Sequence, residues 1–300
     1  MSQIAVPETQ NKLAAQSASR EFSWAWIGVI PFFVFAVAFM IWPAASLFTG
    51  SFLDRQGNFT LDNIFGLFQP FVISAFFLSI RISAVTALGG GLFGFLLAYT
   101  VILGGLPRQT RVALMTFCGV ASNFAGVPLA FAFISTLGRV GFLTVFLRET
   151  LGVNLYDLGF NLYGFWGLSL VYMFFQLPLM VLIISPALDG LKREWREASE
   201  NLGASGWQYW RYVALPILLP SLLGSIILLF GNAFGAYATA AALASTSLNL
   251  ATILIGAQIR GDVLNNPGLG YAMALGMVMV MAVSIAGYSL LQRRTARWLR

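Results

Sequence analysis

Histidine is absent from the 300-residue chain, and cysteine occurs only once, at Cys118. Without histidine the chain lacks the commonest metal ligand and the usual acid–base catalyst, so a serine–histidine dyad and a histidine-ligated metal site are excluded. A single cysteine excludes a disulfide framework and a multi-thiolate metal centre. Charged residues are also scarce, at 9% of the chain against about 25% in an ordinary soluble domain. The composition therefore argues against a soluble protein.

Long hydrophobic runs dominate what is present, since 58% of the residues are hydrophobic. Six windows reach the roughly 20 residues that an α-helix needs to cross a bilayer. Lipid cannot satisfy an open backbone, so these spans are expected to be helices, and the alternating segments of about ten residues that a β-barrel requires do not occur. The predicted fold is an all-α integral membrane protein with spans near residues 24–48, 74–103, 112–137, 164–188, 216–240 and 269–291.

The distribution of lysine and arginine predicts the orientation of these spans. With the N-terminus inside, twelve of the seventeen basic residues fall in cytoplasmic segments and four in outer loops, in agreement with the positive-inside rule. Both termini are then cytoplasmic. The predicted organisation is a polar tail over residues 1–23, a membrane domain over 24–292 and a short basic end over 293–300.

One cytoplasmic loop, residues 189–215, has a pattern of its own. Apolar residues recur at intervals of four, three and four, and charged residues occupy the opposite face. The apolar positions are Leu191, Trp195, Ala198 and Leu202. Gly203 is suited to end this helix in a left-handed conformation, and Ser205 with Gln208 predicts a capping box that opens a second short helix. Two amphipathic helices joined by a tight turn are expected, although a basic loop resting on lipid headgroups fits the same pattern.

The same loop resembles a known family. Its fixed positions are Glu197-Ala198-Ser199, Gly203, Val213 and Leu215-Pro216. Three residues separate the first group from Gly203, nine separate Gly203 from Val213, and one separates Val213 from Leu215. This pattern resembles the EAA loop of binding-protein-dependent ATP-binding cassette (ABC) importer permeases, with Ser199 in place of the second alanine and Val213 in place of isoleucine. The six-span layout is similar too. Within the family the chain looks most like the permeases of polyamine (spermidine/putrescine) importers.

The resemblance implies a type I ABC importer permease fold in a bacterial inner membrane, with no enzymatic site and no cofactor in this chain. In this family the paired helices of the loop are coupling helices that seat on a separate ATPase dimer, which holds ATP and magnesium. A second permease, homologous or identical, and a solute-binding protein complete the importer; no nucleic acid is involved. The residues expected at the ATPase contact are Trp195, Arg196, Glu197, Ala198, Ser199, Gly203, Ser205, Trp207, Leu215 and Pro216.

Other motifs bear on the energy source. The two lysines, Lys12 and Lys192, follow asparagine and leucine, so neither fits a Walker A loop and ATP must be hydrolysed by another polypeptide. Residues 89–94 match Gly-x-Gly-x-x-Gly inside an apolar span, where Gly90 and Gly94 are expected to let helices approach closely. Gly231 and Gly235 form a second such pair. No predicted span contains aspartate or glutamate, which argues against proton- or sodium-driven transport.

Polar residues within the spans are candidates for a substrate path: Arg81, Asn123, Gln176, Asn232 and Tyr237. An intramembrane charge is a functional candidate by default, but Arg81 lies near the outer end of its span, where it could snorkel to headgroups. For Asn123 and Gln176, interhelical hydrogen bonding explains the residue as well as substrate contact does. Because Arg81 would repel a polyamine, an anionic or zwitterionic substrate such as a phosphonate stays open, as does an ATP-independent channel.

Overall fold

The computed structural model describes residues 25–244, 247–260 and 266–296. These residues form helices joined by turns, with one isolated bridge between Leu53 and Phe59. The prediction of an all-α protein is confirmed. The predicted cytoplasmic tail lies outside the described residues, as do the last four residues of the predicted basic end.

The chain divides into two compact units, residues 1–49 and 50–300. In the first unit α2 (Ala25–Ala36) passes through a π-helical turn (Val37–Ile41) into α3 (Trp42–Ser51), whose last two residues belong to the second unit. None of the residues from α2 to α3 is charged. A helix that is apolar on every face is typical of a membrane span.

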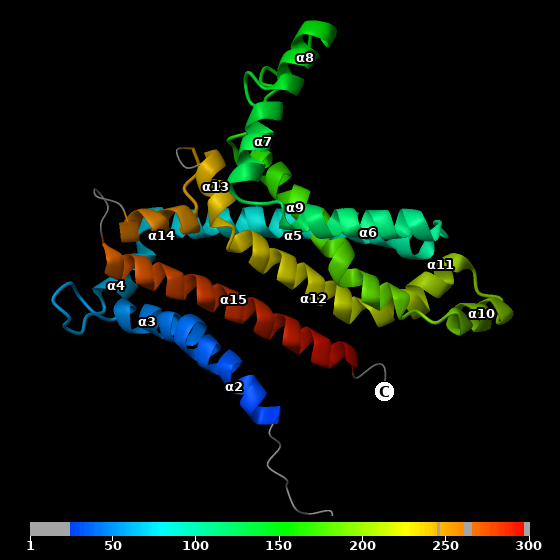
Figure 1. Ribbon diagram of the computed structural model, residues 1–300, viewed down its shortest axis with the longest axis horizontal. Helices are drawn as coiled ribbons and strands as arrows, with labels where there is room; N and C mark the ends of the chain where they lie inside the picture. Colours follow the sequence, from blue (N-terminus) through cyan, green and yellow to red (C-terminus); the bar gives the residue numbers. More distant parts are fainter. Residues whose placement is uncertain (1–24, 245–246, 261–265, 297–300) are drawn as a thin grey trace, which may run out of the picture. The chain divides into compact units, whose positions relative to one another are not determined.

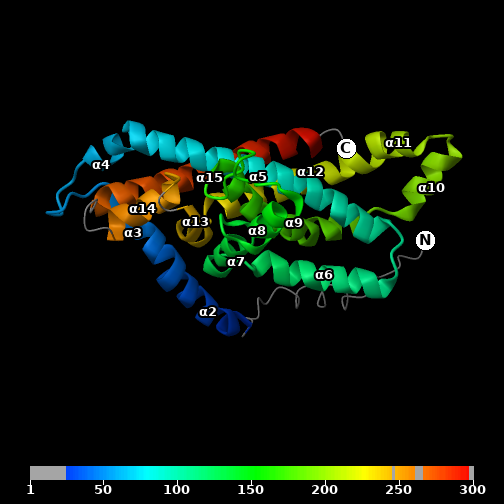
Figure 2. The same cartoon turned by 90° about the horizontal axis from the view of Figure 1, so that it is seen from above.

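Long helices form the body of the second unit: α5 (Pro70–Leu103), α6 (Arg108–Asn123), α9 (Phe165–Asp189), α12 (Leu215–Phe234) and α15 (Pro267–Ala296). Helix α5 packs along α9 and α12, α6 lies against α9, and α15 lies along α12 (Figures 1 and 2). Apolar side chains of α5, α9 and α12, including Met180, Ile184 and Leu229, fill the space between them. In a membrane such contacts act through close packing of side chains.

Shorter helices complete the unit: α4 (Asp62–Phe65), α7 (Val127–Leu137), α8 (Phe142–Leu151), α10 (Arg193–Asn201), α11 (Gly206–Tyr209), α13 (Tyr237–Ala244) and α14 (Ala251–Arg260). Helices α7 and α8 extend away from the body of long helices (Figure 1). Figure 1 shows α10 and α11 at one end of the second unit, and α4 and α14 at the other. The chain enters α12 directly after α11 and leaves it just before α13. Helix α12 therefore connects the two ends.

Glycines allow the close contact between α5 and α9. A Cβ atom at Gly90 would lie 2.7 Å from the Cβ of Gln176, and one at Gly94 would lie 2.6 Å from the Cβ of Met180. Residues four apart on α5 thus meet residues four apart on α9 in the same order, so the two helices run parallel. The predicted close packing at Gly90 and Gly94 is confirmed, because a side chain at either position would overlap α9.

The second predicted glycine pair has two separate roles. Gly231 faces α15, where a Cβ atom would lie 2.5 Å from the methyl carbon of Met281. Gly235 follows the last residue of α12, and its N–H donates to the carbonyl of Gly231 at 3.0 Å. The prediction of close helix approach is right for Gly231 and wrong for Gly235, which ends the helix instead.

Six helical stretches of the described residues are long and apolar enough to cross a membrane. Four of them agree with the spans predicted from the sequence: Gly28–Ser51, Pro70–Leu103, Phe165–Asp189 and Pro267–Gln292. The third and fifth stretches differ from the prediction, in both cases because glycine interrupts the helix.

The predicted third span, residues 112–137, is divided between α6 and α7. Gly126 has a positive φ of 77° and Pro128 lies in the first turn of α7, so α6 cannot continue through this point. The stretch of sufficient length is Val127–Leu151, which joins α7 and α8 and extends into the predicted outer loop. Since this stretch includes Glu149, the prediction that no span contains an acidic residue is wrong here.

The predicted fifth span, residues 216–240, begins and ends earlier in the structure. Helix α11 passes through a π-helical turn (Trp210–Ala214) into α12, so one continuous stretch covers Gly206–Phe234. After Gly235 the chain turns and starts α13. Tyr237, expected inside the span, therefore lies beyond its end.

Candidate functional site

Helices α10 and α11 form a helical hairpin, residues 193–209, between α9 and α12 (Figure 1). Charged side chains pair along α10: Arg193 Nε lies 2.8 Å from Glu197 Oε1, and Arg196 Nε lies 2.9 Å from Glu200 Oε1. Both pairs have the four-residue spacing that brings side chains together on a helix. The hydrogen bond to Glu200 raises the pKa of the Arg196 guanidinium above its ordinary value. Helix α10 is therefore supported by its own surface charges.

Gly203 makes the turn of the hairpin. Its φ is +81°, its N–H donates to the carbonyl of Glu200 at 2.9 Å, and the N–H of Ala204 donates to the carbonyl of Ser199 at 3.0 Å. This pair of hydrogen bonds is the Schellman arrangement that closes a helix C-terminus. A Cβ atom at Gly203 would meet nothing within 4 Å, so only the backbone conformation requires glycine. The predicted left-handed helix end is confirmed.

Ser205 and Gln208 cap the second helix reciprocally. The N–H of Gln208 donates to Ser205 Oγ at 3.3 Å, and the N–H of Ser205 donates to Gln208 Oε1 at 2.7 Å. The predicted capping box is confirmed. Because the helix end at Gly203 and the helix start at Ser205 are both hydrogen-bonded, little freedom is left between α10 and α11.

The apolar face predicted for α10 is mostly uncovered. Leu202 is 88% exposed, Ala198 is exposed, and Trp195 is half-buried with Lys192 Nζ 5.8 Å from its ring centre. We call these three apolar residues the α10 strip. An exposed apolar strip on a well-held support is typical of a surface that a partner covers.

Trp207 lines an apolar groove between α11 and the end of α5. The groove holds about 530 Å³ and is formed by Phe95, Leu96, Tyr99, Trp207, Trp210, Arg211 and Leu215. Trp210 packs edge-on against Tyr99, with ring centres 5.1 Å apart. The sequence places Trp207 and Leu215 among the expected ATPase contacts, and the structure groups them with α5.

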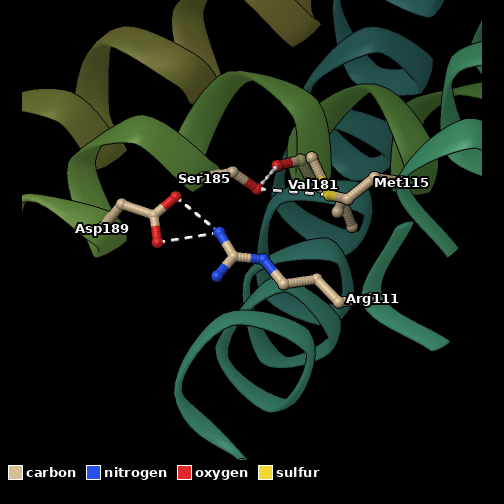
Figure 3. Close-up of polar contacts among 5 residues, drawn as sticks. All are labelled: Arg111, Met115, Val181, Ser185 and Asp189. Atoms are coloured by element: carbon tan, nitrogen blue, oxygen red, sulfur yellow. Dashed lines mark hydrogen bonds and ion pairs between the residues drawn. The ribbon is translucent and has the colours of Figure 1, made fainter. Parts of the chain in front are cut away.

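An ion pair ties the end of α9 to α6. Arg111 Nη2 donates to both carboxylate oxygens of Asp189, at 2.8 and 2.7 Å, and Ser185 Oγ lies 3.8 Å from the sulfur of Met115 (Figure 3). Asp189 is the last residue of α9, and three residues separate it from the first residue of the hairpin, Arg193. Sequence reasoning counted Arg111 only as an orientation charge, because nothing local relates it to a residue 78 positions away.

The other motif positions have structural roles in this chain. The hydroxyl of Ser199 donates to the carbonyl of Arg196 at 2.8 Å, within α10. Val213 is partly buried in the π-helical turn, and Pro216 lies in the first turn of α12. Because α12 continues from the π-helical turn without a break, Pro216 lies inside a helical stretch, where its missing N–H leaves a gap in the hydrogen bonding directly after that turn. These residues shape the connection from the hairpin to α12.

Arg81 lies beside the start of α9. Its guanidinium carbon is 5.5 Å from the ring centre of Phe77 and 5.2 Å from that of Phe165, the first residue of α9. Arg81 is exposed whereas the next two residues of α5 are buried, so it lies off the packed face of that helix. A cation at the level where a neighbouring span begins fits snorkelling to the headgroups.

Gln176 and Asn123 have different surroundings. Gln176 is completely buried, and its Nε2 donates to the carbonyl of Leu229 at 2.9 Å, which links α9 to α12. Its Oε1 has no partner among the described residues. Asn123 is exposed, and its Nδ2 donates to the carbonyl of Gly119 in its own helix at 2.9 Å. The interhelical role that the sequence left open is thus observed for Gln176.

Asn232 and Tyr237 lie on either side of the break at Gly235, and both are exposed. The guanidinium carbon of Arg260 is 5.4 Å from the ring centre of Tyr237. The structure does not gather the five polar candidates into one site, since Gln176 lies inside the helix core. Sequence reasoning missed Arg260, which it counted only as an outer-loop charge.

A family profile matches most of the chain. The profile described as "Binding-protein-dependent transport system inner membrane component" covers residues 90–297. The match includes the hairpin, the helices on either side of it and α15. The family predicted from the loop motif is confirmed.

Curated relatives are similar over part of their length. The sulfate transport system permease protein CysT of Escherichia coli (strain K12) is 29% identical over 171 residues, which cover 56% of this chain and 58% of the relative. The thiamine transport system permease protein ThiP of the same strain is 30% identical over 129 residues, covering 43% of this chain and 23% of the relative. The chain thus spans less than two thirds of these relatives. Neither carries a polyamine name, so the finer polyamine-type prediction is not supported.

A solved structure has the same fold. A chain in the crystal structure of a bacterial ABC transporter involved in the import of the acidic polysaccharide alginate aligns with a TM-score of 0.74 at 15% identity. The alignment covers 96% of this chain and 99% of that one. The predicted type I importer permease fold is confirmed.

Proposed function

Since the chain belongs to the family of binding-protein-dependent transport system inner membrane components, we propose that it is a permease subunit of an ABC importer for a small solute. The observation that carries this proposal is the α10–α11 hairpin, whose turn is fixed at Gly203 and whose α10 strip is exposed. The hairpin is the docking element for a separate ATPase. It continues into α12, so a force on it reaches the membrane helices directly.

The geometry suits a lever. Hydrogen bonds on both sides hold the turn of the hairpin. The pair Arg111–Asp189 holds the end of α9, from which the chain enters the hairpin. Leu202 and Trp195 offer apolar anchors, and the charged pairs occupy the opposite face of α10. A few apolar anchors that a partner buries supply most of the binding energy of a specific interface. Closure of the ATPase dimer would pull on α10 and α11 and move α12, giving alternating access.

We infer the remaining machinery from the family. Two ATPase subunits hold ATP and magnesium, a second permease completes the substrate path, and a solute-binding protein delivers the substrate. Both termini are cytoplasmic. Catalysis belongs to the ATPase, and this chain contributes no cofactor site of its own.

We propose a small oxyanion, of which sulfate is the example, as the substrate class. The relative CysT supports this choice. Thiamine is a second candidate, favoured by the likeness to ThiP.

Replacing Gly203 tests the lever. At a positive φ a side chain costs about 1–2 kcal/mol, and a β-branched residue is a genuine outlier, so Gly203→Val and Gly203→Ala should distort the turn. We expect the variants to lose the ATPase during purification in mild detergent and to lose solute uptake in cells. Gly203→Asn should be milder, because asparagine tolerates this conformation better.

Gly105 provides the matched control. It also has a positive φ, +71°, and a Cβ atom there would also meet nothing within 4 Å, but it lies in the loop between α5 and α6. Gly105→Ala should therefore retain the ATPase. Normal uptake and ATPase retention in Gly203→Val would refute the docking role of the hairpin.

A further inference from the structure

A cavity lies between α13 and α14, in the second unit and beyond the end of α12. It holds about 230 Å³ and is formed by side chains of both helices: Tyr237, Thr252, Ile255, Gly256, Ile259 and Arg260. Figure 1 shows α14 at the end of the unit opposite α10 and α11. The cavity is therefore far from the ATPase-docking hairpin, beside the end of the second unit where α14 lies.

Arg260 brings a positive charge to this cavity. Its guanidinium carbon is 5.4 Å from the ring centre of Tyr237, and it forms no ion pair with a carboxylate of the described residues. Stacking on a ring engages the face of the guanidinium, whereas its five N–H donors point outward in the plane of the group. Those donors are available to a ligand that accepts hydrogen bonds.

The Tyr237 ring is held close to the backbone of α14. A Cβ atom at Gly256 would lie 3.2 Å from both Cε2 and Oη of Tyr237, so the absence of a side chain at this position makes room for the ring. The side chains of Ile255 and Ile259 form an apolar wall beside the exposed guanidinium of Arg260. Thr252, one helical turn before Gly256, adds a hydroxyl donor.

Other arginines of the second unit are placed differently. Arg139 and Arg148 line a separate cavity that also contains Asp157, and Arg148 lies 3.9 Å from Glu149. The described residues that line the cavity of Arg260 include no acidic side chain. Among the described residues, Arg260 is thus the charged side chain of its cavity, whereas the arginines of the other cavity lie beside acidic residues.

We propose that Arg260 and Tyr237 form a binding site for a small oxyanion on the substrate path of this chain. The proposal rests on the proposed importer function and assigns part of the charge selectivity to the permease itself. Arg260 binds the anion through its N–H donors, and Tyr237 is a positioning residue that orients the guanidinium. Thr252 supplies a further hydrogen bond.

Uptake of radiolabelled sulfate, phosphate and thiamine by the source cells tests this site, with chromosomal variants compared with the wild type and with a deletion of the chain. Arg260→Ala should raise the KM for the transported anion about tenfold or more, as expected for the loss of a charge-assisted hydrogen bond. Arg260→Lys should recover part of that loss. Tyr237→Phe should behave like the wild type, and Tyr237→Ala should raise the KM. Arg148→Ala is the matched control and should leave the KM unchanged.

Several outcomes overturn the proposal: an unchanged anion KM in Arg260→Ala, or a deletion that lowers the uptake of thiamine alone or of no anion. If Arg260→Ala does not accumulate in the membrane, Arg260→Lys and Arg260→Gln decide the same question. Both variants keep the bulk of the side chain, and only lysine keeps its charge. Equal KM values for these two variants overturn the proposal. The importer function fails separately, when the chain retains no ATPase during purification and its deletion changes no uptake.

Discussion

The two ends of the second unit are held together in different ways. At the α10–α11 end, the hydrogen bonds of the turn join residues three to five positions apart, such as Gly203 with Glu200 and Ala204 with Ser199. At the opposite end the N–H of Gly126 donates to Thr239 Oγ1, 113 positions away, and the N–H of Ala251 donates to Ser79 Oγ, 172 positions away. One end is specified locally, and the other only when distant helices have assembled.

This difference has a functional consequence. A locally specified hairpin keeps its shape while the membrane helices move, which a lever must do. An end made of long-range contacts changes when the helices shift, which suits a part that must open and close around a solute. In each case the hydrogen bonding matches the role that we propose.

The largest effect is expected where both ends share a support, at the contact of α5 with α9. In Gly94→Ala the new methyl group would lie 2.6 Å from the Cβ of Met180 and 2.7 Å from the carbonyl oxygen of Leu177, so backbone must move. We expect destabilisation by about 1–3 kcal/mol or more, seen as a lower thermal midpoint in detergent. Gly287→Ala is the control, since a Cβ there meets nothing within 4 Å. Equal midpoints for the two variants would contradict the packing of this contact.

Much of the fold could be predicted because lipid imposes simple constraints on sequence. Apolar length identifies most of the spans, and the close approach at Gly90 and Gly94 follows from small residues four apart. The third and fifth spans could not be bounded, because Gly126 and Gly235 end helices inside apolar runs. Hydropathy does not change at such a break, so length alone places the boundary in the wrong position.

At the end opposite the hairpin, Thr239→Val should have the next largest effect. The substitution keeps the shape of a buried side chain but removes the acceptor of the Gly126 N–H, which lies 2.8 Å from Thr239 Oγ1. An unsatisfied buried donor costs about 1–3 kcal/mol. Amide hydrogen exchange at Gly126 should accelerate, whereas Thr239→Ser should retain protection. Unchanged exchange in the valine variant would show that this bond does not hold α7 to α13.

The candidate sites also differ in whether local or long-range contacts define them. The hairpin was predictable residue by residue, since a Schellman turn and a capping box are written in consecutive positions. Arg260 was not predictable, because its role depends on a ring that lies 23 positions earlier in a different helix and on a cavity between them. Arg111 was missed for the same reason.

At the hairpin end, Ser205→Ala tests local specification. Loss of the cap that receives the Gln208 N–H should destabilise α11 by about 1 kcal/mol. Because the bond is local, faster amide exchange should be confined to the hairpin and absent at Gly126. Ser289→Ala is the control, since that hydroxyl only donates to the carbonyl of Ile285 within α15. Exchange that spreads to the opposite end would contradict the independence of the two ends.

The smallest effect is expected at a long-range ion pair near the hairpin, between Arg111 and Asp189. Both side chains are over a third exposed, so solvent screening limits their interaction. A double-mutant cycle with Arg111→Gln and Asp189→Asn should give a coupling energy of about 0.5–1 kcal/mol in thermal or denaturant unfolding, falling as salt is added. Uptake should drop more than this small energy suggests, because the pair positions the end of α9 next to the hairpin and contributes little to the stability of the fold. A coupling energy of zero together with normal uptake would leave the hairpin supported by its local hydrogen bonds alone.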